Sequence, residues 1–165
     1  MGQCAQIVSE IMQRQLIKSG QIAVNRRARY DYSIDDTIEA GLALTGAETK
    51  SIRFGLVSLV DSFVQSKGDN LVVKNMMITP LPTANKAVYF DERRDKQLLL
   101  HRNQINRLQG KLVEKGATIV PLKIYFNHRG LIKILLGVGF GKSQIDKRET
   151  IKKREWERTK RGLKK

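Results

Sequence analysis

Apolar and polar residues alternate along an early stretch of the chain, and this alternation constrains the fold more than any other feature. Successive side chains of a β-strand point to opposite faces of the sheet, so a two-residue period gathers the apolar side chains on one face. The pattern therefore predicts one long, half-buried strand that ends at Gly46. Its apolar residues all occupy even positions: Tyr32, Ile34, Ile38, Ala40, Leu42 and Leu44.

Further strands are expected in pairs around turns. Residues 76–78 should extend the resulting sheet, and residues 80–94 have the mixed composition of a loop. Pro121 has no N–H group to donate to a β-ladder, so it marks either an edge strand or a bulge. The paired segments are 59–65 with 71–74, around Lys67-Gly68-Asp69, and 118–126 with 132–138, around residues 127–130.

Two short helices are expected between these strands. Residues 47–53 form one, stopped by Gly55, and the spacing of Ile105, Leu108 and Leu112 predicts another that Gly116 closes. Short antiparallel strands with hairpin spacing favour a mainly β chain folded as a small barrel. Barrels of this size in basic proteins are often of the oligonucleotide-binding type, which is an argument from analogy. We expect an N-terminal extension (1–21), a β-barrel domain (22–141) and a C-terminal tail (142–165).

The charge of the chain indicates a negatively charged partner. The 165 residues carry a formal net charge of +15, with a pI near 10.2. Nucleic acid is the commonest such partner, and an anionic membrane surface comes second. Cys4 is the only cysteine, which excludes an internal disulfide and suits a reducing cytoplasm. No apolar run is long enough to span a bilayer.

The C-terminal tail carries much of this charge. Lys and Arg outnumber Asp and Glu there by eleven to four, and its apolar residues are too few and too irregularly spaced to bury against a core. Asp146 and Glu149 have the spacing of a helix capping box. We therefore expect a basic helix that is disordered until it binds a polyanion. The candidate binding residues are Lys142, Asp146, Lys147, Arg148, Lys152, Lys153, Arg154 and Trp156, whose indole is either a stacking platform or an idle aromatic.

Three other places could contact nucleic acid. One is the run Asn25-Arg26-Arg27-Ala28-Arg29-Tyr30, which combines three guanidinium groups with a phenol. These groups either bind phosphates and bases or are an ordinary run of solvated charges. Glu39 lies on the polar face of the long strand and either accepts hydrogen bonds from bases or is an ordinary exposed acid. Three successive leucines, 98–100, cannot all face one core, so at least one is expected to be exposed.

Catalysis has little support in the sequence. His101 fits a helix start and His128 a turn, and the glycine-rich run 137–142 lacks the spacing of a phosphate-binding loop. We expect no catalytic residue, no metal and no cofactor. The remaining alternatives are a ribosomal or general single-strand-binding barrel protein, an RNA-modifying enzyme, and a peripheral membrane protein that uses residues 1–18.

Most of the chain, from about Ala23 to Arg161, resembles the small protein B family, also called SsrA-binding proteins. The blocks that carry the resemblance occur in the family's order: Asn25-Arg26-Arg27-Ala28-Arg29, Glu39-Ala40-Gly41-Leu42-Ala43-Leu44-Thr45-Gly46, Lys50-Ser51-Ile52-Arg53, Asp61-Ser62-Phe63-Val64, Leu98-Leu99-Leu100-His101, Val120-Pro121-Leu122-Lys123-Ile124-Tyr125-Phe126 and Asp146-Lys147-Arg148-Glu149. Ile145 stands where the family usually has an aromatic residue or His before Asp-Lys-Arg, and residues 1–21 match nothing in the family pattern.

The resemblance implies a function without enzymatic activity. Members of the family bind the tRNA-like domain of transfer-messenger RNA and carry it to stalled ribosomes, together with the elongation factor that delivers tRNA. It implies that Asn25, Glu39 and Leu99 contact this RNA. With such a partner, we expect Arg26, Arg27 and Arg29 to position the phosphate backbone, and Tyr30 to stack or form a hydrogen bond. It also implies that the tail enters the decoding centre of the small ribosomal subunit and the empty mRNA channel. We expect the chain to act as a cytoplasmic monomer.

Overall fold

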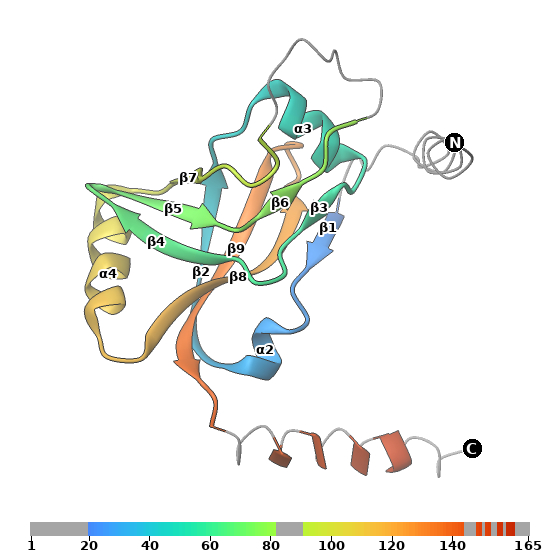
Figure 1. Ribbon diagram of the computed structural model, residues 1–165, viewed down its shortest axis with the longest axis vertical. Coiled ribbons are helices and arrows are strands. Elements are labelled where there is room, and N and C mark those ends of the chain that lie inside the picture. Colours follow the sequence, from blue (N-terminus) through green and yellow to red (C-terminus); the bar gives the residue numbers. More distant parts are fainter. Residues whose placement is uncertain are drawn as a thin grey trace.

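The computed structural model describes residues 20–81, 91–143, 148–149, 151–152, 155–156 and 158–160 (Figure 1). Among the described residues before Lys142, more lie in strands than in helices, and every strand pair is antiparallel, which confirms the predicted mainly β fold. The strands are β1 Gly20–Val24, β2 Tyr32–Leu42, β3 Val57–Ser58, β4 Phe63–Lys67, β5 Asn70–Lys74, β6 Met77–Ile78, β7 Lys96–Leu99, β8 Ala117–Phe126 and β9 Ile132–Gly141. The helices are α2 Ala28–Asp31, α3 Gly46–Arg53 and α4 Arg102–Val113.

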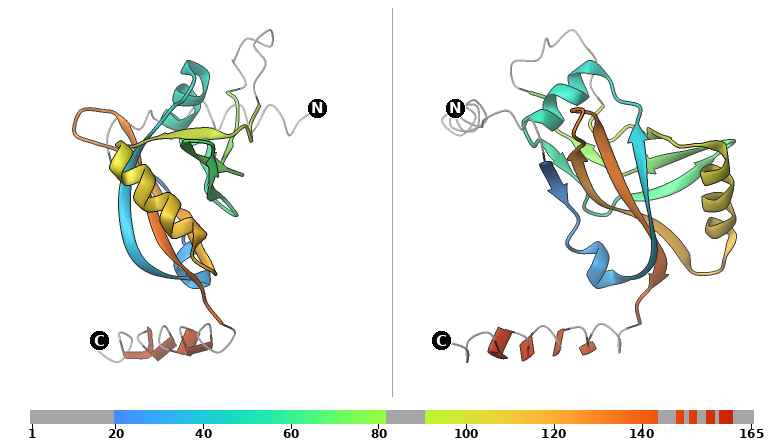
Figure 2. Two further views of the ribbon diagram at one scale, coloured as in Figure 1. Left: turned by 90° about the vertical axis from the view of Figure 1, so that its left-hand side faces the viewer. Right: turned by 180° about the vertical axis from the view of Figure 1, so that it is seen from behind.

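Seven strands form one curled sheet in the order β1-β8-β9-β2-β7-β5-β4, and β3 pairs with β6 in a separate small sheet. The curl brings the edge strand β4 into contact with β8, and α4 contacts β4, β5 and β8 (Figure 2). The described residues contain no hydrogen-bonded ladder between β4 and β8. The sheet is therefore curled without being closed, and the oligonucleotide-binding type of barrel stays a prediction.

The main core fills the concave side of this sheet. Its members are buried aliphatic side chains from nearly every element, including Ile52 of α3, Leu108 of α4 and Ile134 of β9. A smaller cluster lies beneath α2, where Ala28 packs against Val120 and Leu122 of β8. Both faces of β8 are thus buried over part of its length, which leaves only selected positions of the sheet open to solvent.

Most elements predicted from periodicity are confirmed. The long strand is β2, the helices are α3 and α4, and the paired strands are β4 with β5 and β8 with β9. The ladder between β8 and β9 shifts register between Pro121 and Lys123, so the predicted irregularity at Pro121 is a bulge. His101 precedes the first residue of α4 and His128 lies in the turn after β8, as expected.

Four features differ from the prediction. Strand β2 ends at Leu42 and not at Gly46, because Thr45 already caps α3, which begins at Gly46. Residues 77–78 do not extend the main sheet, because they pair with β3 instead. The strand predicted to begin at residue 59 begins at Phe63, after a turn in which Asp61 adopts a positive φ of 56°. Strands β1, β3 and β7 and helix α2 were not predicted. Strand β1 also begins two residues before the proposed boundary between extension and domain.

The backbones of β2 and β9 lie very close together at Gly139. A Cβ atom built on Gly139 would lie 1.9 Å from the carbonyl oxygen of Ser33. The register of the ladder shifts in the same place, between Ile34 and Asp36. No side chain larger than hydrogen fits at this position, so the absence of a Cβ atom permits the bend of the longest strand pair.

A buried ion pair joins α3 to the segment before β7. Glu48 is 2% exposed and closes a capping box with Thr45, while both of its carboxylate oxygens accept hydrogen bonds from Arg94, at 2.8 and 2.6 Å. Burial alone would raise the pKa of Glu48, but the hydrogen bonds from Arg94 and from the Thr45 N–H, with the nearby positive charges, hold it below its ordinary value of 4.5.

Lys96 beside this pair is fully buried. Its ammonium group donates to the carbonyl oxygens of Met76 and Glu92, at 2.8 and 2.9 Å. Burial lowers the pKa of Lys96 below its ordinary value of 10.5, although Glu48 acts in the opposite direction. These bonds attach the first residue of β7 to the chain on both sides of residues 82–90.

Replacing Gly139 should strongly destabilise the fold. We expect Gly139→Ala to lower the free energy of unfolding by about 3 kcal/mol, because a backbone carbonyl must move to admit the methyl group. Gly141→Ala is the matched control in the same strand, since a Cβ atom at Gly141 meets nothing within 4 Å. Urea denaturation measures both. Equal stability of the two variants would contradict the proposed close approach.

Glu48→Gln should destabilise the protein by about 2 kcal/mol at pH 7, the scale of hydrogen bonds to a charged group. Because the pKa of Glu48 is lowered in the folded protein, its contribution is complete above about pH 4.5 and is lost as the pH falls through the lowered value. The difference from the unmodified chain should shrink accordingly in denaturation curves at falling pH. Glu114→Gln, which removes an exposed ion pair with Lys111, should change stability by less than about 0.5 kcal/mol at every pH.

Candidate nucleic-acid interface

Four polar side chains gather on the convex face of the sheet, and we name them the sheet patch: Glu39, Lys123, Tyr125 and Lys133. The strand register places them there. Lys123 and Glu39 are both paired with Leu135, and Tyr125 is paired with Lys133. Their neighbours Ile124, Ile134 and Ala40 point to the opposite face and are buried in the core. The hairpin β8–β9 and the strand β2, which is far from it in sequence, thus present these functional groups in two adjacent outward rows.

The sheet patch is internally connected. The hydroxyl of Tyr125 donates a hydrogen bond to one carboxylate oxygen of Glu39, and the ammonium group of Lys133 lies 3.5 Å from the other. The ammonium group of Lys123 lies 5.0 Å from the centre of the Tyr125 ring. Burial, the hydrogen bond and the charge of Glu39 raise the pKa of Tyr125 to about 12. Tyr125 therefore remains a hydrogen-bond donor at any physiological pH and fixes the direction of the carboxylate.

Leu99 continues the row of Tyr125 and Lys133 across one further strand. Lys133 pairs with Gly41, and Gly41 pairs with Leu99. A Cβ atom on Gly41 would lie 3.2 Å from the Cβ atom of Leu99, so the missing side chain allows the leucine to lie flat across β2. Leu99 is 54% exposed whereas Leu98 is 2% exposed, which confirms that the leucine run places one residue outward. An exposed apolar side chain now lies beside an oriented carboxylate.

The arginine-rich run forms a tight turn around a buried side chain. Asn25 is 7% exposed; its amide donates to the carbonyl of Leu59 at 3.0 Å and accepts from the N–H of Ala28 at 3.1 Å. Asn25 therefore shapes the turn, and its amide is already engaged by the backbone. Arg26 and Arg29 are exposed, and Tyr30, in the short helix α2, is partly exposed.

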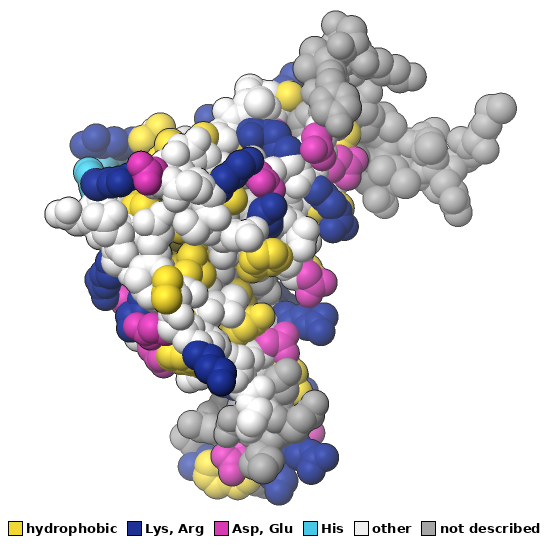
Figure 3. Space-filling view, turned by 60° about the vertical axis from the view of Figure 1, so that its left-hand side comes forward, with side chains coloured by type: hydrophobic (Ala, Val, Ile, Leu, Met, Phe, Trp, Pro, Cys, Tyr) yellow, Lys and Arg dark blue, Asp and Glu magenta, His cyan; other side chains and the backbone are white. Residues whose placement is uncertain are grey.

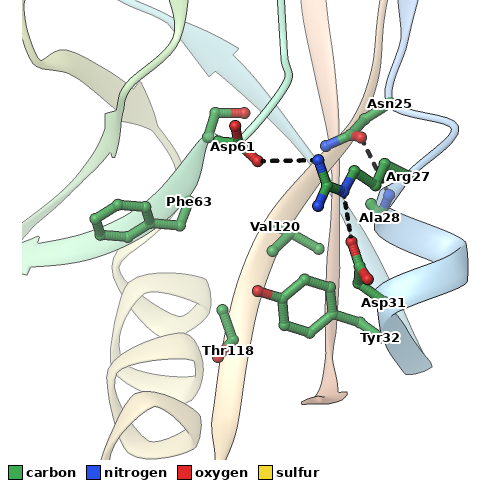
Figure 4. Close-up of a pocket in the computed structure, with 10 residues that line it drawn as sticks. Asn25, Arg27, Ala28, Asp31, Tyr32, Asp61, Phe63, Thr118 and Val120 are labelled. Atoms are coloured by element: carbon green, nitrogen blue, oxygen red, sulfur yellow. Dashed lines mark hydrogen bonds and ion pairs between the residues drawn. The ribbon is translucent and has the colours of Figure 1, made fainter. Parts of the chain in front are cut away.

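Arg27 lies between two carboxylates at the rim of a shallow cavity of about 280 Å³ (Figure 4). Its Nε is 3.0 Å from Asp31 and its Nη1 is 4.0 Å from Asp61. The other groups around this cavity include Tyr32 and Thr118. Because two acids already compensate Arg27, Arg26 and Arg29 are the better placed of the three guanidinium groups to meet a phosphate.

The C-terminal tail begins beside this turn. The backbone N–H of Lys142 donates to the carbonyl of Asp31 at 2.8 Å, and its ammonium group donates to the carbonyl of Arg29 at 3.1 Å. Two basic segments separated by more than one hundred residues therefore meet at one end of the sheet (Figure 1). The sequence offers no local signal for this contact.

From Arg148 onward, the described residues of the tail are helical and exposed. They include the predicted binding residues Arg148, Lys152 and Trp156, whereas Asp146, Lys147, Lys153 and Arg154 lie outside the described residues. Trp156 is 64% exposed, with the ammonium group of Lys160 4.5 Å from the centre of its ring. The exposed Trp156 agrees with a helix that has no apolar face to bury.

The predicted residues therefore occupy two places and not one. Glu39 and Leu99 lie in the middle of the sheet, and the arginine turn lies near Tyr32, seven residues along β2 and about 20 Å away at a rise of about 3.3 Å per residue. The sequence analysis missed Tyr125, Lys123 and Lys133. Alternation along β8 marks Lys123 and Tyr125 as outward-facing, but their contact with Glu39 depends on a pairing that only the fold provides.

Charge is mixed on the face shown in Figure 3. Lys and Arg side chains are scattered there, and several lie beside Asp or Glu, without merging into one basic stripe. About half of the excess positive charge belongs to the C-terminal tail, so recognition on the sheet depends on particular contacts. In the described part of the chain, no three His, Cys, Asp or Glu side chains gather as a metal site would require. No helix among the described residues has the length and hydrophobicity to span a bilayer.

Comparison with known proteins gives one consistent result. The sequence model of the SmpB protein family matches residues 22–165. SsrA-binding proteins from Rhodopseudomonas palustris (strain HaA2) and Nitrobacter winogradskyi are 46% and 47% identical to this chain over 142 residues, which is 86% of the chain and 90% of each relative. A solved structure described as "tmRNA-SmpB: a journey to the center of the bacterial ribosome" is 45% identical, with a TM-score of 0.62, over 78% of this chain and 93% of the other. The chain belongs to the SmpB family.

Proposed function

We propose that this chain binds transfer-messenger RNA and acts with it on the ribosome in trans-translation. The SsrA-binding relatives and the structure of a tmRNA–SmpB ribosome complex support this proposal. The family is an RNA-binding family and not an enzyme family, so binding and delivery are the whole of the activity. The chain would recognise the tRNA-like domain of the RNA and deliver it to stalled ribosomes as a cytoplasmic monomer, with the elongation factor that delivers tRNA.

One observation carries the proposal at the level of the structure. The row Tyr125–Lys133–Gly41–Leu99, with Glu39 beside it, presents a fixed carboxylate, a cation and an apolar side chain on one rigid sheet. A carboxylate repels phosphates, so its place in a basic protein suits base amino and imino groups, which donate hydrogen bonds. An oriented acceptor of this kind favours a folded RNA with accessible base edges over an unstructured strand.

The other predicted residues take roles that their positions suit. Arg26, Arg29 and Tyr30 would hold the phosphate backbone, and Arg27 would join them if the RNA displaced one of its two acids. Asn25 would act by shaping the turn, because its amide is bonded to the backbone. The basic tail would enter the decoding centre and the mRNA channel, with Arg148, Lys152 and Trp156 exposed along its helix.

The anchoring of Lys142 refines the boundary between domain and tail. Its two hydrogen bonds to α2 make it part of the folded domain, so a clean deletion of the tail begins after Ser143. A deletion that begins at Lys142 would also disturb the arginine turn. We therefore place the functional boundary at residues 143–144, and the N-terminal boundary at the start of β1.

Replacing Glu39 tests specific recognition. Removing a negative charge should strengthen any purely electrostatic binding to RNA, whereas losing an oriented acceptor should weaken it. We expect Glu39→Gln to reduce affinity for the transcribed tRNA-like domain about tenfold, the scale of one good base contact. A binding titration at 200 mM salt measures this change.

The control for Glu39 is Glu114→Gln, the same substitution on an exposed helix end, which should leave affinity unchanged. An elongator tRNA and a single-stranded RNA complete the comparison. Binding through about 6–10 phosphate contacts loses about 10³–10⁵ in affinity between 50 and 200 mM salt. If all three RNAs bind equally and lose affinity with salt to that extent, the chain is a general RNA-binding protein and the proposal is wrong.

Deleting the tail after Ser143 should separate capture from rescue. We expect the shortened chain to bind the tRNA-like domain within about threefold of the full chain at 200 mM salt, where non-specific contacts contribute least. Peptide tagging on stalled ribosomes in a reconstituted translation system should be lost. A full-length chain with residues 144–165 in shuffled order controls for charge alone. Normal tagging by either variant would refute the role assigned to the tail.

A further inference from the structure

A hollow of about 620 Å³ lies around Leu99 and extends to the sheet patch. We name it the amide hollow, after the three carboxamide side chains around it: Asn70, Gln97 and Gln104. Leu100, which is partly exposed, provides apolar lining beside Leu99, and Glu39 and Lys133 of the sheet patch also border the hollow. The hollow is therefore continuous with the surface that we propose to bind RNA.

Three different elements bring the carboxamides together. Gln97 and Leu99 are two residues apart on β7 and share its exposed face. The alternate residues of the strand, Lys96 and Leu98, are buried. Strand β5 pairs with β7 through Val72 and Gln97, which sets Asn70 beside that face. Gln104 comes from the first turn of α4, where its Oε1 accepts from the N–H of His101 at 3.1 Å.

Most of the carboxamide groups keep their hydrogen-bonding capacity. The side chains of Asn70 and Gln97 make no hydrogen bond to another described residue, and the amide Nε2 of Gln104 makes none either. Asn70 and Gln97 are also exposed. Two complete carboxamides and one amide donor are thus available to a ligand, above an apolar lining.

This combination suits a nucleobase. A carboxamide offers a donor and an acceptor side by side, which is the arrangement on the edge of a base. The apolar lining and Leu99 can contact the flat face of a base, while Lys133 can meet the attached phosphate. A paired base in an A-form helix cannot enter a hollow, because its edge lies within a groove and its faces are stacked.

We propose that the amide hollow binds one unpaired nucleobase of the RNA, turned out of its stack, with Gln97 and Asn70 reading the edge of that base. This inference rests on the proposed function, because it names the part of the RNA that the sheet surface receives. The inserted base would lie next to Leu99 and close to the fixed carboxylate of Glu39, which also borders the hollow.

The test compares two carboxamide side chains of the hollow with a glutamine outside it. Gln97→Ala and Asn70→Ala remove the base-reading groups, and Gln65→Ala on β4 is the matched control outside the hollow. The probe is the transcribed tRNA-like domain. We expect each hollow variant to lose about tenfold in affinity with an unchanged dependence on salt, since no phosphate contact is lost. Gln65→Ala should bind like the unmodified chain, and all three variants should unfold at the same urea concentration.

Chemical probing of the RNA identifies the base. The unmodified chain should protect the Watson–Crick edge of one unpaired nucleotide from dimethyl sulfate or carbodiimide, and Gln97→Ala should expose it again while the other protections remain. Identical affinity and identical protection with Gln97→Ala and Gln65→Ala would overturn the inference. If the unmodified chain fails to prefer this RNA at all, the proposed function fails, and that outcome is distinct from the loss of one base contact.

Discussion

The pairing of β2 with β9 is the interaction on which the rest of the structure depends. These two strands and β8 are the longest in the chain, and their ladders run through the centre of the main sheet. At Gly139 the two backbones approach so closely that no side chain fits, and the register shifts beside it. The resulting bend allows seven strands to curl around one core and brings β4 to β8. Every functional surface described above is fixed to this central pair.

The sheet patch and the amide hollow are two consequences of that register. Lys133 is opposite both Tyr125 and Gly41, so a single residue of β9 relates the carboxylate of Glu39 to the apolar surface of Leu99. Gly41 contributes because it has no side chain, which leaves room for Leu99 to lie against β2. Binding groups on a rigid sheet pay little conformational entropy when a ligand arrives, which favours recognition of a folded RNA.

Two buried charges hold the edge of this surface in place. The carboxylate of Glu48 accepts a hydrogen bond from Arg94, 46 residues further along the chain. The ammonium group of Lys96 donates to the carbonyl oxygens of Met76 and Glu92, which lie on either side of residues 82–90. These bonds fix the start of β7, three residues before Leu99. At the other end of the sheet, Lys142 attaches the tail to α2. Charged side chains thus have structural roles in addition to the electrostatic attraction that a net charge of +15 gives the whole chain.

The sequence by itself determined the features that depend on neighbouring residues. Alternation identified β2, a Gly in a short polar turn identified the β4–β5 hairpin, and helical spacing identified α4, because each pattern is set within a few residues. The charge of the tail and its lack of an apolar face were equally local. Only the tertiary structure decided which strands pair and in which register. Glu39 meets Tyr125 across 86 residues, and Arg29 meets Lys142 across 113. Such contacts follow from the packing of the whole sheet, which no local pattern encodes.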